Sequence, residues 1–199
     1  MTTPGRPAAP PSNWNLPNAL TLLRILMVPL FGWLLLSNGG DEPVWRVAAF
    51  GCFLAAMLTD RLDGEIARRR GLVTNFGKIA DPIADKALTG TAFVGLSLLG
   101  ELSWWVTVIV LGRELLITLV RFVVIRYGVI AASRGGKLKT VLQVVALCAY
   151  ILPVGDVFVL HLVAVGVMAA AVVVTVWTGG EYAVHALRVW REGRAAERP

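Results

Sequence analysis

The sequence is short of charged residues. Asp, Glu, Lys and Arg together make up 16% of its 199 residues, whereas 56% are hydrophobic. A soluble domain carries about 25% charged residues. The mean hydropathy of +0.69 points in the same direction. The composition therefore excludes an ordinary soluble domain and predicts a membrane protein.

Cysteine and histidine are also scarce, with two of each. Cys52 and Cys148 lie inside apolar runs without a CxxC pattern, and His161 and His185 have no partner at metal-ligand spacing. This excludes a disulfide framework and a Cys/His zinc site. We interpret the cysteines as small buried apolar residues.

The N-terminal residues lack the pattern of a cleaved signal peptide, in which an apolar run follows a basic segment directly. Residues 1–13 are rich in Pro, Ala, Thr and Ser and are predicted to form a disordered tail. Residues 14–182 are predicted to form one membrane domain. Residues 183–199 are predicted to form a cytoplasmic tail that begins as an amphipathic interfacial helix.

Long apolar runs dominate the rest of the chain. A membrane-spanning helix needs about 20 mainly apolar residues. We therefore predict an all-α, polytopic membrane protein with six transmembrane helices. Their expected ranges are 19–37, 44–62, 79–99, 103–126, 138–154 and 157–178.

The connecting segments alternate in charge. Those near 37–43, 100–103 and 153–156 contain acidic but no basic residues, whereas 63–78, 127–138 and the C-terminal tail are rich in Lys and Arg. Basic loops remain on the cytoplasmic side, so both termini are predicted to be cytoplasmic. The net charge of +6 is then explained by one membrane face, which argues against nucleic-acid binding.

Four aspartates stand out at the ends of the second and third predicted spans: Asp60, Asp63, Asp81 and Asp85. Each pair is three or four residues apart and so shares a helix face, and antiparallel neighbouring helices would bring the pairs together. Clustered carboxylates repel one another, and Mg²⁺ or Mn²⁺ would compensate them. Four carboxylates can hold two ions about 4 Å apart, the geometry used for displacement at phosphorus.

Structural interpretations of these aspartates remain open at this point. Asp81 precedes Pro82 and would make a good N-cap with proline at the first helical position. Asp60 or Asp63 could instead pair with Arg61, Arg68 or Arg69. Three small residues favour a ligand instead: Gly64, Gly77 and Ala67, which precedes Arg68. They would allow a phosphate to approach the backbone closely, beside a guanidinium.

A second set of basic residues follows. Arg113 and Arg121 lie in the fourth predicted helix, and Lys137 and Lys139 lie around the start of the fifth. Arg113 and Arg121 are eight residues apart and share one stripe. Intramembrane arginines usually mark functional sites. The alternative is structural, with Arg113 paired to Glu114 and Arg121 extending its charge towards the membrane surface.

The stretch from Asp60 to Asp85 reads D-x2-D-G-x2-A-R-x8-G-x3-D-x3-D. It resembles the diagnostic motif of the CDP-alcohol phosphatidyltransferase family, with every fixed position present. The resemblance implies a six-helix homodimer in the bacterial inner membrane, with an active site facing the cytoplasm. It also implies that the four aspartates bind two divalent cations and that Asp85 is the general base.

By the same resemblance, the CDP-linked lipid would be bound by Asp63, Gly64, Ala67, Arg68 and Gly77. The stretches "NLPNALTLLRILMVPLF", "GRELLITLVR" and "GKLKT" resemble bacterial members that transfer the phosphatidyl group of CDP-diacylglycerol to glycerol 3-phosphate. The second basic set would then bind the phosphate of that acceptor.

Three alternatives remain. The acceptor could be inositol phosphate, or phosphatidylglycerol as in one type of cardiolipin synthase. A membrane transporter would also place charges within helices, but transporter sites lie near the bilayer midplane between inverted repeats, and the sequence shows no such repeat. A structural scaffold would leave the motif unexplained.

Overall fold

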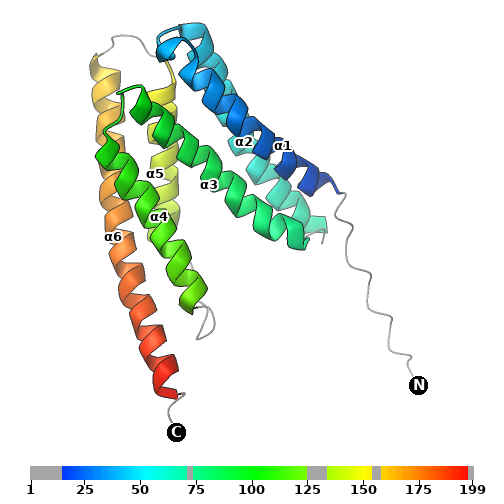
Figure 1. Ribbon diagram of the computed structural model, residues 1–199, viewed down its shortest axis with the longest axis vertical. Coiled ribbons are helices and arrows are strands. Elements are labelled where there is room, and N and C mark those ends of the chain that lie inside the picture. The colour runs from blue at the N-terminus through cyan, green and yellow to red at the C-terminus, as the bar shows by residue number, and fades with distance from the viewer. Residues whose placement is uncertain (1–14, 71–73, 125–133, 154–157, 197–199) are drawn as a thin grey trace, which may run out of the picture. The chain divides into compact units, whose positions relative to one another are not determined.

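The computed structural model describes residues 15–70, 74–124, 134–153 and 158–196, excluding the side chains of 61–70, 75, 76, 78, 123, 134 and 192–196. These residues form six α-helices and one short 3₁₀ helix (Figure 1). The all-α prediction is therefore confirmed. The helices are α1 (Leu16–Leu36), η1 (Ser37–Gly40), α2 (Pro43–Arg70), α3 (Asn75–Leu98), α4 (Trp104–Val124), α5 (Arg134–Ile151) and α6 (Phe158–Ala196).

The chain divides into two compact units, residues 1–91 and 92–199. In the first unit, α1 packs along α2. Phe31 and Phe53 meet there with ring centroids 5.4 Å apart. Ala49 and Ala56 of α2 are fully buried, and such small side chains allow two helices to approach closely. Residues 75–91 of α3 complete this unit, and the rest of α3 belongs to the second unit.

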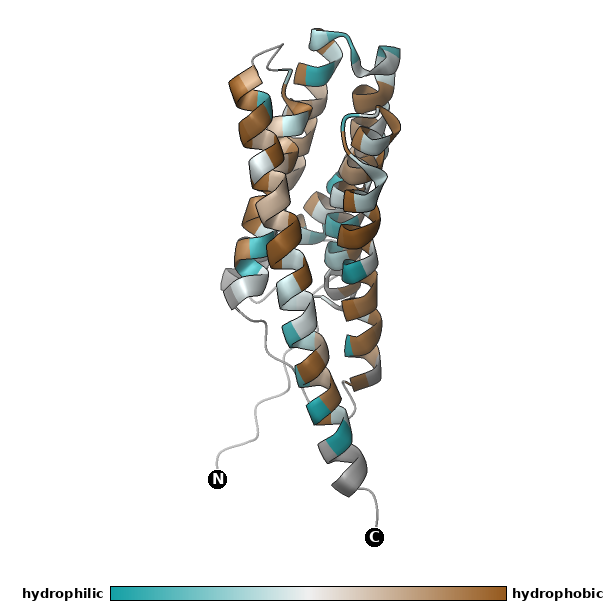
Figure 2. Ribbon diagram, turned by 90° about the vertical axis from the view of Figure 1, so that its left-hand side faces the viewer, coloured by the Kyte–Doolittle hydropathy of each residue, from teal (hydrophilic) through white to brown (hydrophobic). Residues whose placement is uncertain are grey.

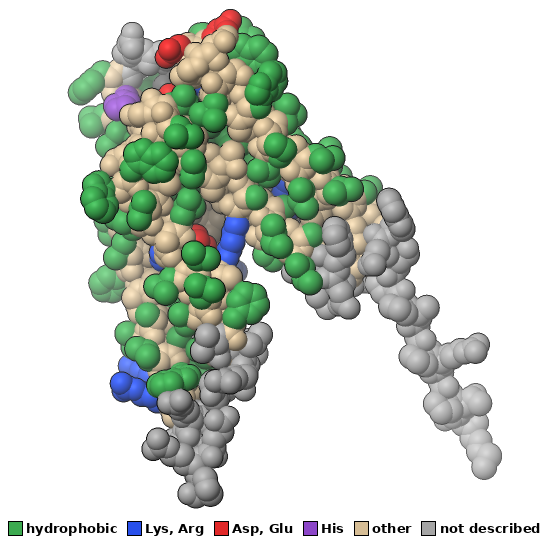
Figure 3. All heavy atoms as spheres, viewed as in Figure 1, with side chains coloured by type: hydrophobic (Ala, Val, Ile, Leu, Met, Phe, Trp, Pro, Cys, Tyr) green, Lys and Arg blue, Asp and Glu red, His purple; other side chains and the backbone are tan. Residues whose placement is uncertain are grey.

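In the second unit, α6 packs against both α4 and α5. Its core includes Leu147 and Ile151 of α5 and Met168 and Ala171 of α6. Many large apolar side chains on the outside are exposed; Trp105, for example, is 77% exposed. Hydrophobic side chains cover much of the visible surface in Figure 3. Apolar surfaces of this extent suit contact with lipid rather than water.

Three stretches are long and apolar enough to cross a membrane: Leu16–Gly40, Pro43–Asp60 and Phe158–Arg191, counted within the described residues. They belong to α1 with η1, α2 and α6. The remaining three helices lie where spans were predicted, but they are shorter or more charged, and α4 alone contains Arg113, Glu114 and Arg121. The prediction of six transmembrane spans, with both termini cytoplasmic, therefore stays a prediction.

Several predicted boundaries were wrong. The second helix was expected to end at residue 62, but α2 continues to Arg70. The third was expected from residue 79, but α3 begins at Asn75. The expected loop 63–78 is therefore mostly helical. Its residues include Glu, Ile, Ala and Arg, and charge alone does not end a helix made of good helix formers.

The sixth helix also differs from the prediction. A span over 157–178 followed by a separate amphipathic helix was expected, but α6 is continuous from Phe158 to Ala196. It passes through Gly179 and Gly180, each of which weakens a helix by about 1 kcal/mol. Long helical segments on both sides offset this. Figure 2 shows its hydrophobic turns giving way to hydrophilic ones towards the C-terminal end.

Candidate active site

Two of the four motif aspartates have described contacts with α1. Thr21 Oγ1 donates a hydrogen bond to Asp81 Oδ1 at 2.6 Å. Arg24 Nη1 donates to Asp60 Oδ1, also at 2.6 Å. The structure therefore brings carboxylates of α2 and α3 to neighbouring positions along one helix. Among the described residues, Asp60 pairs with Arg24 of α1. The alternative in which it pairs with Arg61, Arg68 or Arg69 concerns side chains outside the described residues and stays open.

The alternative interpretation of Asp81 as a helix N-cap was wrong. Asp81 and Pro82 lie inside α3, which begins at Asn75. Thr74 occupies the N-cap position instead, and its hydroxyl accepts a hydrogen bond from the backbone N–H of Gly77 at 3.0 Å. A threonine at this position satisfies one of the unpaired N–H groups of the first helical turn. Asp81 is therefore not needed to begin the helix.

The donor set suits a hard divalent cation. In both Asp60 and Asp81, Oδ1 is held by α1, and Oδ2 has no hydrogen-bond partner within the described part of the chain. Carboxylate oxygens are the ligands that Mg²⁺ and Mn²⁺ prefer. Asp60 is 38% exposed at its side chain, so an ion can reach it. The described side chains contain no group of three candidate metal ligands, and Asp63 lies outside that set.

The remaining motif residues are placed as follows. Asp85 lies on α3, one turn after Asp81, and is half-buried. Gly77 is buried, and a Cβ there would lie 3.1 Å from Asn18 Oδ1. A glycine thus allows α1 to approach α3 closely. Four predicted site residues lie on α2, where their side chains are outside the described residues: Asp63, Gly64, Ala67 and Arg68.

In the second unit, the structure gathers two of the four predicted cations around one carboxylate. Glu114 Oε1 accepts a hydrogen bond from Arg113 Nη1 at 2.9 Å. The same oxygen also forms an ion pair with Lys139 of α5. The pairing of Arg113 with Glu114 was anticipated as a structural alternative, and it is confirmed. Lys139 was not expected to share this carboxylate.

Further contacts fix Arg113 in place. Its Nη2 donates to Thr178 Oγ1 at 3.1 Å, and Thr178 Oγ1 donates to the carbonyl of Val174 at 2.7 Å. The hydroxyl proton is thereby committed, so a lone pair faces the guanidinium. Arg113 Nε is buried and has no hydrogen-bond partner among the described residues. Residues of α4, α5 and α6 thus form one cluster of hydrogen bonds and ion pairs, made of Arg113, Glu114, Lys139 and Thr178.

The other two predicted cations lie differently. Arg121 and Lys137 are exposed, and neither forms an ion pair in the part of the chain that the structure describes. Their assignment to an acceptor pocket stays a prediction. Lys139, by contrast, is only 5% exposed. A buried ammonium is unfavourable unless it is paired, which explains its close contact with Glu114.

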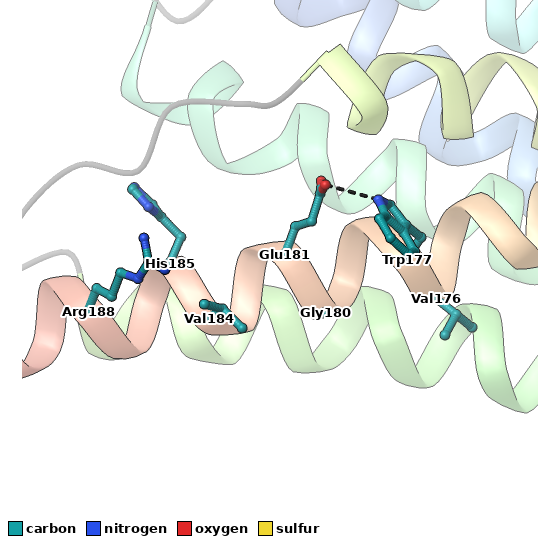
Figure 4. A pocket seen from close by; sticks show the side chains of 7 residues that line it. All are labelled: Val176, Trp177, Gly180, Glu181, Val184, His185 and Arg188. Carbon is teal, nitrogen blue, oxygen red and sulfur yellow. Dashed lines mark hydrogen bonds between the residues drawn. The ribbon is translucent and has the colours of Figure 1, made fainter.

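A groove along α6 contains none of the predicted site residues. It is lined in part by Trp177, Glu181, His185 and Arg188 (Figure 4). Trp177 Nε1 donates to Glu181 Oε1 at 2.9 Å. A tryptophan at the end of an apolar stretch, followed by cationic residues, is typical of the membrane–water interface. We interpret this part of α6 as the interfacial segment.

Sequence reasoning missed Thr21, Arg24 and Glu114. A signal for the first two was present, since polar residues recur every third position in an apolar helix: Asn18, Thr21 and Arg24. Residues at this spacing share one helix face. Glu114 was considered only as a structural partner of Arg113, and nothing in the local sequence connects it with Lys139.

An all-α fold with exposed apolar surfaces and three helices apolar enough to cross a membrane, within the described residues, defines a helical membrane protein. The family model for CDP-alcohol phosphatidyltransferases matches residues 14–177. The chain therefore belongs to the CDP-alcohol phosphatidyltransferase family.

Relatives within the family are similar over most of their length. The chain is 53% identical over 174 residues to a probable phosphatidylglycerophosphate synthase of Mycobacterium tuberculosis, covering 87% of this chain and 82% of the relative. A CDP-diacylglycerol–glycerol-3-phosphate 3-phosphatidyltransferase of Bacillus subtilis is 39% identical, covering 70% and 77%. An enzyme of the same name from Rickettsia typhi is 36% identical, covering 84% and 94%.

Proposed function

We propose that this protein is a phosphatidyltransferase that moves the phosphatidyl group of CDP-diacylglycerol to glycerol 3-phosphate, giving phosphatidylglycerophosphate and CMP. The names of its relatives specify this acceptor. One structural observation supports it above others: a guanidinium and an ammonium, from Arg113 and Lys139, meet on Glu114. Such a cationic pair suits a phosphomonoester, which glycerol 3-phosphate carries and an uncharged alcohol lacks.

The CDP-linked lipid is assigned to the first unit. Asp60, Asp63, Asp81 and Asp85 would hold two divalent cations, and Asp63, Gly64, Ala67, Arg68 and Gly77 would bind the CDP moiety. The Oδ2 atoms of Asp60 and Asp81, which have no hydrogen-bond partner among the described residues, support this assignment. Such ions would supply charge neutralisation at the diphosphate, which improves CMP as a leaving group.

The protein residues then have defined tasks. Asp85 accepts the proton of the acceptor hydroxyl as that oxygen attacks the lipid-linked phosphorus. A new P–O bond forms, and the bond from this phosphorus to the oxygen of CMP breaks. Arg113, Arg121, Lys137 and Lys139 bind the acceptor phosphate and orient its hydroxyl. Holding the two reactants in line removes much of the entropic part of the barrier.

Location and assembly are part of the proposal. The basic connecting segments favour an active site at the cytoplasmic face of the bacterial inner membrane, and the family resemblance favours a homodimer. Cysteine labels at Lys137 should react only from the cytoplasmic side, and labels at Asn38 and Glu101 only from outside, with Cys52 and Cys148 replaced. A reversed pattern would refute this topology.

One assay separates the possible acceptors. Purified protein in lipid vesicles would receive CDP-diacylglycerol and Mg²⁺ with glycerol 3-phosphate, inositol phosphate or phosphatidylglycerol, and CMP release would be followed. Glycerol 3-phosphate should give a kcat/KM at least about tenfold above the others, since a site built for one polar group discriminates strongly. Faster release with either alternative would reassign the acceptor.

A further inference from the structure

Three polar side chains recur along α1, in a helix that is otherwise mainly apolar. Asn18, Thr21 and Arg24 are 6%, 1% and 0% exposed. Residues three apart lie on one helix face, so these side chains form a single buried stripe. Buried polar groups are unfavourable unless they are hydrogen-bonded. The hydrogen-bond partners of these three side chains therefore indicate their role.

For Thr21 and Arg24, the partners include motif carboxylates. Thr21 binds Asp81 on α3, and Arg24 binds Asp60 on α2, each through Oδ1 at 2.6 Å. The Thr21 distance is typical of a charge-assisted O–H···O⁻ bond, and the Arg24 distance is slightly shorter than the usual length of an N⁺–H···O⁻ bond, about 2.7–2.9 Å. One face of α1 thus reaches both helices that carry the aspartates, although α1 itself contains none of the motif.

The third member of the stripe contacts the beginning of α3. Asn18 Oδ1 accepts a hydrogen bond from Thr74 Oγ1 at 2.9 Å, and Thr74 in turn accepts from the N–H of Gly77. Asn18 therefore holds the N-cap of the helix that carries Asp81. This contact fixes where α3 begins and hence where Asp81 lies relative to α1.

The Thr21 hydroxyl has two acceptors within reach and one proton. Besides Asp81, the carbonyl of Pro17 lies 3.1 Å from Oγ1. A carboxylate is the stronger acceptor, and 2.6 Å is a typical length for an O–H···O⁻ bond. The proton therefore goes to Asp81 Oδ1, which leaves Oδ2 as the oxygen available to a ligand.

We propose that the polar face of α1 forms part of the metal site together with α2 and α3. In this site, Thr21 and Arg24 are positioning residues for the aspartates that bind the cations. Each fixes one oxygen of a carboxylate and so determines which oxygen meets the ion. Arg24 also provides a fixed positive charge that compensates the carboxylates before cations bind. Outer contacts of this kind orient metal ligands and commonly change metal affinity by about 10- to 100-fold. The inference rests on the proposed function, because it takes the aspartates as metal ligands.

Manganese binding tests this directly, without turnover. Purified protein in detergent would be titrated with Mn²⁺, and free Mn²⁺ would be measured by electron paramagnetic resonance. Thr21→Val keeps the shape of the side chain but removes the hydroxyl, and it should weaken Mn²⁺ binding about tenfold or more. Thr21→Ser restores the hydroxyl and should stay within about threefold of the natural protein.

A matched control exists in the second unit. Thr107 is 3% exposed and also uses its hydroxyl in buried hydrogen bonds, to Ser97 and to the carbonyl of Phe93. Thr107→Val should therefore leave Mn²⁺ affinity unchanged, because it removes a buried hydroxyl that touches no aspartate. Arg24→Lys provides a second test, since it keeps the charge but not the guanidinium geometry, and it should weaken binding about three- to tenfold.

The outcomes separate the two proposals. If the natural protein binds Mn²⁺ and releases CMP, while Thr21→Val and Arg24→Lys bind Mn²⁺ equally well, the role of α1 is refuted and the proposed function stands. If the natural protein neither binds Mn²⁺ nor releases CMP, both proposals fall together. A loss of affinity in Thr107→Val as large as that in Thr21→Val would also refute the role of α1, because the effect would then be a general loss of packing.

Discussion

The two units solve the same electrostatic problem with opposite signs. In the first, an arginine of α1 that is fully buried contacts a carboxylate of the motif, Asp60. In the second, a carboxylate, Glu114, contacts two cations, Arg113 and Lys139. Each proposed binding site thus already contains one charge of the same sign as the ligand that it would bind.

A charged partner within a binding site can affect the orientation of the binding groups and the electrostatic attraction of the ligand in different ways. An isolated charge in a low-dielectric surrounding is unfavourable, and a partner of opposite sign reduces that penalty. The partner also lowers the net attraction for a ligand, so its benefit must lie in orienting the groups that remain available. We therefore expect affinity in both units to depend on the orientation of paired groups as well as on net charge.

The largest expected effect lies in the first unit. Asp81→Asn keeps an oxygen that Thr21 can bind but removes the negative charge that a divalent cation requires. Turnover should fall at least about a hundredfold, which is more than we expect from losing the Thr21 or Arg24 contact to an aspartate. Excess EDTA should abolish the activity of the natural protein, and Mg²⁺ or Mn²⁺ should restore it.

Circular dichroism and membrane extraction would show whether the Asp81→Asn protein remains folded and inserted. Full activity in excess EDTA would contradict the assignment of a metal site to this unit. It would also remove one side of the comparison, since Arg24 would then simply neutralise a structural carboxylate.

The next largest effect concerns the second unit and should change the KM of only one of the two substrates. Arg113→Ala should raise the KM for glycerol 3-phosphate, since a charged hydrogen bond contributes about 1.5–3 kcal/mol, equivalent to roughly ten- to a hundredfold. The KM for CDP-diacylglycerol should stay nearly constant. Steady-state kinetics with each substrate varied in turn would measure both.

Two further variants sharpen this test. Arg113→Lys should recover little, because an ammonium cannot replace the guanidinium that contacts both Glu114 and Thr178. Arg188→Ala is the control, since Arg188 is exposed on α6. If the Arg113 variants lose affinity for CDP-diacylglycerol and keep it for glycerol 3-phosphate, the acceptor site is misassigned.

A smaller effect tests orientation against attraction. Glu114→Gln removes a negative charge near the proposed phosphate site, so attraction alone predicts tighter binding. We expect the opposite, a three- to tenfold lower kcat/KM for glycerol 3-phosphate, because hydrogen bonds to a neutral amide are about half as strong. Arg113 and Lys139 would then be held less firmly.

The control is Glu181→Gln, which removes an exposed carboxylate whose described hydrogen bond is to Trp177. Kinetics should be unchanged there. A higher kcat/KM in Glu114→Gln would show that net charge governs the second unit, and the parallel with Arg24 would fail.

Sequence reasoning reached the helical class and the family because both depend on local patterns. Apolar runs predict helices, and the spacing of Asp60, Asp63, Asp81 and Asp85 identifies the motif. The helix ends were harder to predict. Thr74 begins α3 through a contact with Asn18 of α1, and no local pattern indicates a partner 56 residues away.

The partners of the charged residues were missed for the same reason. Arg24 and Asp60 are 36 residues apart, and Glu114 and Lys139 are 25 apart. Such pairs depend on which helix faces meet, and this is settled by packing. The periodicity of Asn18, Thr21 and Arg24 did indicate a buried polar face, but not what it would contact.

The smallest expected effect concerns two adjacent glycines. A Cβ at Gly179 would lie 3.2 Å from Arg113 Cγ and 3.4 Å from Arg113 Nε, whereas at Gly180 nothing lies within 4 Å. Both glycines are inside α6, so alanine should favour the helix by up to about 1 kcal/mol at either position. The two substitutions therefore share a backbone effect and differ in their contact with Arg113.

Gly179→Ala should lower kcat/KM for glycerol 3-phosphate about two- to fivefold, since Arg113 must shift by a few tenths of an ångström and a displaced binding group reduces the rate. Gly180→Ala should leave it unchanged and raise the thermal unfolding temperature slightly. In the first unit, Gly77→Ala would press on Asn18 instead and should weaken Mn²⁺ binding without changing the KM for glycerol 3-phosphate. Equal effects of Gly179→Ala and Gly180→Ala would mean that the position of Arg113 tolerates such a shift, and orientation would then matter less in the second unit than in the first.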